Sequence, residues 1–285
     1  MRDNEERFSA LHGADSPAVA QQSSGGDGIG LNFTSPTEIV ELPSKGRFYP
    51  KEHPLHGKEE IEIKFMTAKE EDILTSKALI KKGIAVDRML QNLILDKSIK
   101  VEDLLVGDKN ALIVAARISG YGEEYEVEVT CPSCEEKNKH TFDLSLLGSK
   151  ELEELEELAV RETENGTFLT RLYKTNVEVE FRLLYGKDET AILNEMTMKK
   201  NKTLQVEKNS TSQLKRIILS VNGITDKMQI SSFVDNMPAI DSRQLRTVLR
   251  RLNPEVDMNQ TFECASCGHE EEMEVPFTVE FFWPK

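Results

Sequence analysis

Hydrophobic and charged residues alternate strictly in two stretches that lie far apart in the chain. The hydrophobic positions are Ile61, Ile63 and Phe65 in the first stretch and Val177, Val179 and Phe181 in the second. Alternation with a period of two is typical of a strand that buries one face. We therefore expect a strand near the start of each half of the chain.

Helical patterns follow the first of these strands. The stretch 67–70 (TAKE) has the form of a capping box, so it predicts a helix that runs to about Lys81 and ends at Gly83. A second helix is expected where apolar residues recur at i, i+3, i+4 and i+7. A third begins at the N-cap residue Asp108 and ends at Gly120, after which an alternating strand leads into the first cysteine pair. The stripe of the second helix is Val86, Met89, Leu90, Leu93 and Ile94.

The same order of elements returns in the second half. A helix is expected over residues 188–199, then a helix with a second apolar stripe, then a helix capped by Asp241, and finally a strand into Cys264. The two later stripes are Leu214, Ile217, Ile218 and Val221, and Leu245, Val248, Leu249 and Leu252. Asp241 follows Asp108 by 133 positions, as Cys264 follows Cys131. We infer that the chain contains an internal duplication.

All four cysteines occur in two Cys-x-x-Cys pairs, each between two alternating strands. Such a turn aims two sulfur atoms at one point, and two turns that meet supply the four soft ligands of a closed tetrahedral zinc site. The predicted cofactor is a structural zinc ion, with Cys131, Cys134, Cys264 and Cys267 as ligands. The two pairs are too far apart in the sequence for a local zinc finger, so we expect a zinc ribbon that is shared by both halves. The predicted fold class is α+β, with two tandem strand–helices–strand repeats joined through this four-cysteine zinc ribbon.

Other roles for the cysteines stay open on the sequence alone. Two redox-active dithiols are one alternative, although neither pair lies at a strand-to-helix turn that would lower a thiol pKa. Buried free thiols and disulfides are the others, and disulfides are disfavoured in a cytoplasm. His140 and His269 lie near the pairs. Four thiolates complete a zinc shell, so we expect both histidines to be ordinary surface residues.

Composition divides the chain into five segments. Residues 1–35 are rich in Ser, Gly, Gln and Asp and are expected to be a disordered tail. Residues 36–57 include Pro43, Pro50 and Pro54, which predicts an extended arm. Residues 58–149 form the first repeat and residues 166–285 the second. The acidic segment 150–165 between them is expected to be a solvated connecting helix.

The arm and the aromatic C-terminal end supply the candidate partner-binding residues. These are Leu42, Pro43, Phe48 and Tyr49 in the arm, and Phe281, Phe282 and Trp283 at the end. A stiff apolar arm suits a groove on a partner protein, and Trp and Phe are frequent at the energetic centre of interfaces. The alternative is that the arm packs on its own domain and the aromatic residues complete the ribbon.

Charge and motif content narrow the functional class. The formal net charge is -14, which opposes general binding to phosphate backbones. A local basic patch on two helices of the second copy remains open, formed by Lys215, Arg216, Arg243, Arg246, Arg250 and Arg251. No Walker, dinucleotide-binding, G-x-S-x-G or H-E-x-x-H motif occurs, and no apolar run or signal region indicates a membrane or secretion. We therefore predict a non-enzymatic protein that is kept in a cytoplasm.

Five stretches carry a likeness to a known family: 41–50 (ELPSKGRFYP), 60–74 (EIEIKFMTAKEEDIL), 101–110 (VEDLLVGDKN), 117–122 (RISGYG) and 131–134 (CPSC). Together they resemble the T4-type bacteriophage baseplate protein family, from about residue 36 onward and more closely in the first copy. The resemblance implies a subunit or assembly factor of the central baseplate hub of a contractile-tailed phage. Such a protein is made in the host bacterial cytoplasm and, if retained, stays in the virion tail. It brings no catalytic residue.

Two main functions follow. The first is a structural or assembly protein that binds other baseplate or hub proteins. The alternative is a zinc-ribbon regulator that binds nucleic acid, which the ribbon pattern and the basic helices favour and the overall acidity opposes. A thiol oxidoreductase is a third reading, and it predicts that the metal-free protein turns over a disulfide substrate.

Overall fold

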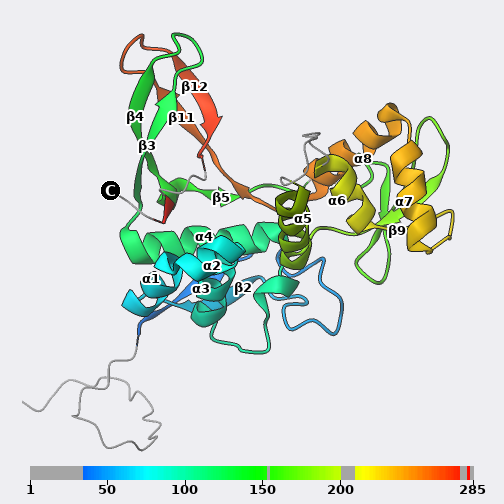
Figure 1. Cartoon of the computed structure of the whole chain (residues 1–285), viewed down its shortest axis with the longest axis horizontal. Helices are drawn as coiled ribbons and strands as arrows, with labels where there is room; N and C mark the ends of the chain where they lie inside the picture. The colour runs from blue at the N-terminus through cyan, green and yellow to red at the C-terminus, as the bar shows by residue number, and fades with distance from the viewer. Residues whose placement is uncertain (1–34, 153–154, 200–208, 277–280, 283–285) are drawn as a thin grey trace, which may run out of the picture. The chain divides into compact units, whose positions relative to one another are not determined.

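Helices and antiparallel strands both contribute to the fold, which is α+β as expected (Figure 1). The computed structural model describes residues 35–152, 155–199, 209–276 and 281–282. The predicted disordered tail over residues 1–35 lies outside the described residues except for Ser35. None of the helices in the described ranges is long and apolar enough to span a membrane.

The first half begins with a hairpin and continues with helices and a second hairpin. Its elements are β1 (Thr37–Glu41), β2 (Glu60–Lys64), α1 (Ala68–Thr75), α2 (Lys77–Lys82), α3 (Ala85–Leu93), the short helix η1 (Val101–Asp103), α4 (Val106–Tyr121), β3 (Glu124–Thr130), β4 (Lys137–Asp143), the short helix η2 (Leu144–Leu146) and β5 (Gly148–Ser149). Strand β1 pairs with β2, and β3 with β4, both antiparallel.

The second half has a four-stranded sheet in the order β6-β7-β8-β9, followed by helices and a last hairpin. Its elements are β6 (Val160–Glu162), β7 (Phe168–Arg171), β8 (Glu178–Phe181), α5 (Gly186–Lys199), α6 (Asn209–Ile217), β9 (Ile218–Val221), α7 (Lys227–Asn236), α8 (Ala239–Leu252), β10 (Val256–Asp257), β11 (Asn259–Glu263) and β12 (Glu270–Glu274). Strand β10 pairs with β5 of the first half, and β11 with β12.

Two helix predictions differ from the structure. The helix expected from Thr67 to Lys81 is interrupted at Ser76, which has an extended conformation and begins the separate helix α2. Serine is a favoured residue at helix starts, although the Ser76 side chain makes no capping hydrogen bond here. The stripe that ends at Val221 is helical only to Ile217, because residues 218–221 form β9 and pair with β8. The β-branched residues of this stretch fit a strand that satisfies the open edge of β8.

The acidic segment 150–165 is not the connecting helix that its composition suggests. Among its described residues no helix is present, and Val160–Glu162 form strand β6. Strand β6 pairs with β7 through a turn at Gly166, which has a φ of 70°. Buried Leu158 and Val160 anchor the segment in the core, and this packing outweighs the helical spacing of its leucines.

The two aspartates expected as N-caps lie one turn further inside their helices. The N-cap residues are Leu105 and Pro238, so Asp108 and Asp241 are each the third residue of a helix, α4 and α8. Both side chains are fully buried. At this depth a carboxylate reaches beyond its own helix and accepts hydrogen bonds from a loop that packs on the helix start.

The two halves also contact each other through main-chain hydrogen bonds. The N–H of Val106 donates to the carbonyl of Leu184 at 3.1 Å, and the N–H of Gly186 donates to that of Leu104 at 2.9 Å. The two segments approach closely at Gly107, because a Cβ atom there would lie 1.6 Å from the carbonyl oxygen of Pro254. The buried hydrophobic residues accordingly form one core cluster with members from both halves.

Candidate metal centre

The two Cys-x-x-Cys pairs occupy the tips of hairpins β3–β4 and β11–β12 (Figure 1). Each tip is closed by the same main-chain hydrogen bonds. The N–H of Cys131 donates to the carbonyl of Glu136, and the N–H of Cys264 to that of His269, both at 2.9 Å. The residue four positions after the first cysteine of each pair, Glu135 or Gly268, has a left-handed conformation, with φ values of 59° and 70°. The two turns therefore have the same main-chain conformation and hydrogen bonding.

The four sulfur atoms converge on one point. All lie within 4.8 Å of one another, with 3.8 Å between Cys131 Sγ and Cys267 Sγ and 3.7 Å between Cys134 Sγ and Cys264 Sγ. A tetrahedral zinc ion with Zn–S bonds of about 2.3 Å requires sulfur atoms roughly 3.8 Å apart. The cluster therefore has the donor atoms and the spacing that a structural zinc site needs.

The cysteines differ in exposure and in pKa. Cys131 and Cys264 are buried, Cys134 is half-buried and Cys267 is exposed. Burial raises the pKa of the Cys264 thiol, but main-chain N–H groups of Cys267 and Ser266 and the neighbouring thiols outweigh it and lower this pKa to about 6. At Cys134 the N–H of Glu136 lowers the pKa, whereas burial and the other three thiols raise it to about 12. A metal ion that binds here displaces the thiol protons.

One residue that sequence reasoning did not single out joins the two hairpins. Buried Asn138 of β4 lies at the metal cluster, where its Nδ2 donates to Cys264 Sγ at 3.4 Å and to the carbonyl of Glu136 at 3.1 Å. Its Oδ1 accepts from the hydroxyl of Ser266 at 3.4 Å. Hydrogen bonds to a ligand sulfur hold it in place and tune its charge. The alternation of the strand could have identified this residue, because Asn138 lies on the same face as Phe142, which is a predicted inward position.

The two histidines near the pairs have other partners. The ring of His140 packs edge-on against Phe142 and Phe262, with centroid distances of 4.6 and 5.2 Å. His269 Nε2 lies 3.3 Å from a carboxylate oxygen of Glu271. Neither belongs to the cluster of metal-binding side chains found among the described residues.

The predicted partner-binding residues lie in the core of the chain itself. Leu42, Phe48 and Tyr49 are at most 2% exposed, and Pro43 is buried as well. The Phe48 ring packs against that of Phe168, with centroids 5.4 Å apart. In this structure the arm therefore packs on its own domain, which was the alternative to docking on a partner.

The C-terminal aromatic residues pack at the base of hairpin β3–β4. The ring of Phe281 lies 5.2 Å from that of Tyr125 and 5.3 Å from that of Phe282, and both phenylalanines are buried. The Tyr125 hydroxyl donates to the carbonyl of Pro276, and buried Arg117 stacks on the Tyr125 ring. Trp283 lies outside the described residues. Phe281 and Phe282 thus support the base of the hairpin rather than offering an exposed anchor.

Comparison with known protein families identifies one match. The profile of the family described as T4 bacteriophage base plate protein matches residues 35–283. The chain belongs to this family. The match covers most of the chain and includes both cysteine pairs and the Asp108 and Asp241 helices. Membership indicates a structural role in the phage baseplate and association with other baseplate proteins. Neither the curated proteins nor the solved structures contain a match to the chain.

Proposed function

We propose that this baseplate protein is a non-enzymatic structural or assembly component of the central hub region, which binds other hub proteins through a body closed by zinc. The convergence of four sulfur atoms from two hairpins that lie 133 positions apart in the sequence carries the proposal. A closed four-thiolate site leaves no open position for water, so its zinc ion stabilises the fold instead of activating a substrate. Cys131, Cys134, Cys264 and Cys267 would hold this ion.

We further propose that the two halves are copies of one unit. Equivalent hydrogen bonds at the two hairpin tips support this reading, as do the equivalent aspartates. Asp108 accepts from the N–H of Ser44 at 2.9 Å, and Asp241 accepts from the N–H of Lys174 at 2.7 Å. In both cases the donor lies in the loop between two paired antiparallel strands, β1 and β2 or β7 and β8.

This correspondence also refines the proposed boundaries. Because β1 is the partner strand of β2, the arm over residues 36–57 supplies the first strand and loop of the first copy. The equivalent strand of the second copy is β7, so that copy is proposed to begin near residue 166, as composition suggested. Strands β5 and β10, which pair with each other, lie in the two segments that connect the zinc ribbon to the second half.

Ion pairs of helix α6 weaken the nucleic-acid alternative at two of the six basic residues named for it. Lys215 forms an ion pair with Asp235 at 2.6 Å, and Arg216 forms one with Glu195. Charges neutralised in this way release few counterions from a phosphate backbone. Retention on immobilised DNA tests the point, because the alternative requires binding that weakens steeply with added salt.

The function is tested by assembly. We expect the full chain, mixed with purified baseplate hub proteins, to sediment with them as a defined complex, and a phage lacking this gene to regain intact baseplates when the chain is supplied. The zinc-free Cys131→Ser variant should complement poorly. The exposed Ser133→Ala variant on the same turn is the matched control and should act as wild type. A chain that neither joins hub complexes nor restores baseplates would refute the proposed function.

A further inference from the structure

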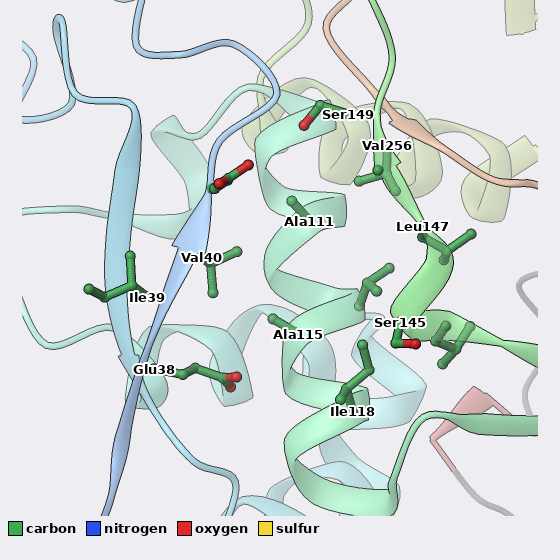
Figure 2. Close-up of a pocket in the computed structure, with 14 residues that line it drawn as sticks. Glu38, Ile39, Val40, Ala111, Ala115, Ile118, Ser145, Leu147, Ser149 and Val256 are labelled. Atoms are coloured by element: carbon green, nitrogen blue, oxygen red, sulfur yellow. The ribbon is translucent and has the colours of Figure 1, made fainter.

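A groove runs along strand β1 on the surface of the first half (Figure 2). Its cavity volume is about 250 Å³. One wall is formed by residues 38–41 of β1, and the opposite wall by Leu144, Ser145, Leu147, Gly148, Ser149 and Val256. Its floor is one stripe of helix α4: Ala111, Val114, Ala115 and Ile118. Small and branched apolar residues on the floor leave room for the side chains of an added polypeptide.

Strand β1 offers unpaired main-chain groups. Among the residues that the structure describes, β2 is the one strand that pairs with it, so β1 is an edge strand. Pro36 accepts a hydrogen bond from Phe65, and Leu42 donates one to Glu59, so even-numbered residues of this strand face β2. Antiparallel pairing alternates between the two directions, and the N–H and C=O groups of Ile39 and Glu41 therefore point away from β2. An exposed edge of this kind is a template for another strand.

The groove also contains a carboxylate oxygen with no partner. Glu38 is half-buried, and its Oε1 atom is buried without a hydrogen bond. Burial raises the pKa of this carboxyl, while a hydrogen bond with Ser119 lowers it. Figure 2 shows the side chains of Glu38 and Val40 on the side of β1 that faces α4, with Ile39 on the other side. Glu38 lines the groove and keeps part of its surface exposed, so a donor that enters the groove can approach this side chain.

We propose that an extended segment of a partner protein binds in this groove as an added strand next to β1, with a Lys or Arg opposite Glu38. An apolar residue two positions away then lies opposite Val40 and packs on α4, because residues of one strand alternate between faces. The proposal rests on the proposed function, since it gives that function a docking surface and a partner chemistry. Charge complementarity selects a basic segment, because Glu38 and Glu41 line the groove, one oxygen of Glu38 has no partner among the described residues, and the chain carries a net charge of -14.

The direct test uses blocked hexapeptides of threonine that carry valine and lysine two positions apart, and twins with glutamate in place of lysine. Binding is followed by NMR on the full-length, zinc-loaded protein. The lysine peptide should shift the amide signals of Ile39 and Glu41 and bind at least about tenfold more tightly than its twin, because an ionic hydrogen bond strengthens strand addition. Glu38→Gln should remove this preference. Glu62→Gln, an exposed carboxylate of neighbouring β2, is the matched control and should keep it.

A second variant separates the strand edge from the charge. Ile39→Pro removes an N–H that points to the groove, so it should abolish binding of both peptides. Circular dichroism and zinc content verify that each variant is folded. Equal affinity for both peptides, unchanged preference in Glu38→Gln, or shifts confined to another surface would overturn the proposal. The proposed function fails separately, because Glu38→Gln and Ile39→Pro proteins that bind no peptide but still enter hub complexes would refute the groove alone.

Discussion

The hydroxyl of Tyr49 donates a hydrogen bond to Oδ2 of Asp108 at 2.7 Å, deep in the first half of the chain. The same hydroxyl oxygen accepts from the N–H of Leu105 at 3.0 Å, at the start of helix α4. The arm is therefore tied to this helix by a buried polar network that also includes Ser44. A buried donor and acceptor that satisfy each other are costly to separate, which makes this contact a sensitive point of the fold.

Replacing Tyr49 by Phe should destabilise the protein by about 1–3 kcal/mol, because it leaves an oxygen of buried Asp108 and the N–H of Leu105 without this partner. Urea unfolding of the zinc-loaded protein measures the difference. Tyr173→Phe is the matched control, since Tyr173 is 71% exposed, and should change stability by no more than about 0.5 kcal/mol. Equal stability of both variants would show that the network does not hold the arm.

The carboxylate of Asp241 should make stability depend on pH in the acid range. Burial raises its pKa, but N–H groups of Lys174 and Thr175 and the Thr175 side chain outweigh this, so its pKa lies below the ordinary value of 3.8. A depressed pKa contributes stability that is present above the unfolded-state pKa and lost as pH falls through the folded-state pKa. Asp241→Asn should therefore cost about 1–3 kcal/mol at pH 7, and the difference from wild type should shrink below about pH 4.

Asp108 should make stability depend on pH in the opposite direction to Asp241. Burial raises its pKa above 3.8, against the lowering effect of hydrogen bonds from Ser44 and Tyr49. The folded protein then binds this proton more tightly than the unfolded chain, so this group lowers stability as pH rises from the unfolded-state toward the folded-state pKa. As pH rises from the unfolded-state pKa to the folded-state pKa of Asp108, the free energy of unfolding of wild type should therefore fall relative to that of Asp108→Asn. Urea unfolding at a series of pH values measures both variants, and parallel profiles would contradict the assignment.

Removal of zinc should loosen the ribbon. We expect one zinc ion per chain by elemental analysis, four thiols that react slowly with a thiol reagent, and four fast-reacting thiols after a strong chelator is added. The melting temperature should fall at the same time. Cys267→Ser should lose the metal even though its side chain is the most exposed of the four. Chelation that changes neither thiol reactivity nor melting would leave the four cysteines without a metal role.

Asn138 should affect zinc affinity without being a ligand. Asn138→Ala removes the N–H group that donates to Cys264 Sγ, and loss of such a contact typically weakens a metal site by about 10–100-fold. Competition with a coloured chelator measures the change. Lys139→Ala on the same strand is the control, because its ion pair with Glu126 is on the exposed face and should leave affinity unaltered. If both variants bind zinc as wild type does, Asn138 has only a packing role.

Local pattern alone determined a large part of this protein. Alternation located β2, β3 and β8, helical spacing located α3 and α8, and the two Cys-x-x-Cys turns identified four residues whose sulfur atoms do converge. These features follow from the periods of strands and helices and from the chemistry of thiolates, which are properties of short segments. The stretches quoted from the first half also sufficed to place the chain in its family.

Tertiary structure decided what depends on distant neighbours. Residues 218–221 became a strand because β8 presented an open edge, and residues 160–162 left a helical pattern because β7 lay beside them. Asp108 and Asp241 serve loops instead of capping helices, since a buried carboxylate is stable only where distant N–H or O–H donors reach it. Asn138 bonds to a sulfur atom 126 positions away. No local period encodes such contacts, because their energy arises only when the two segments meet.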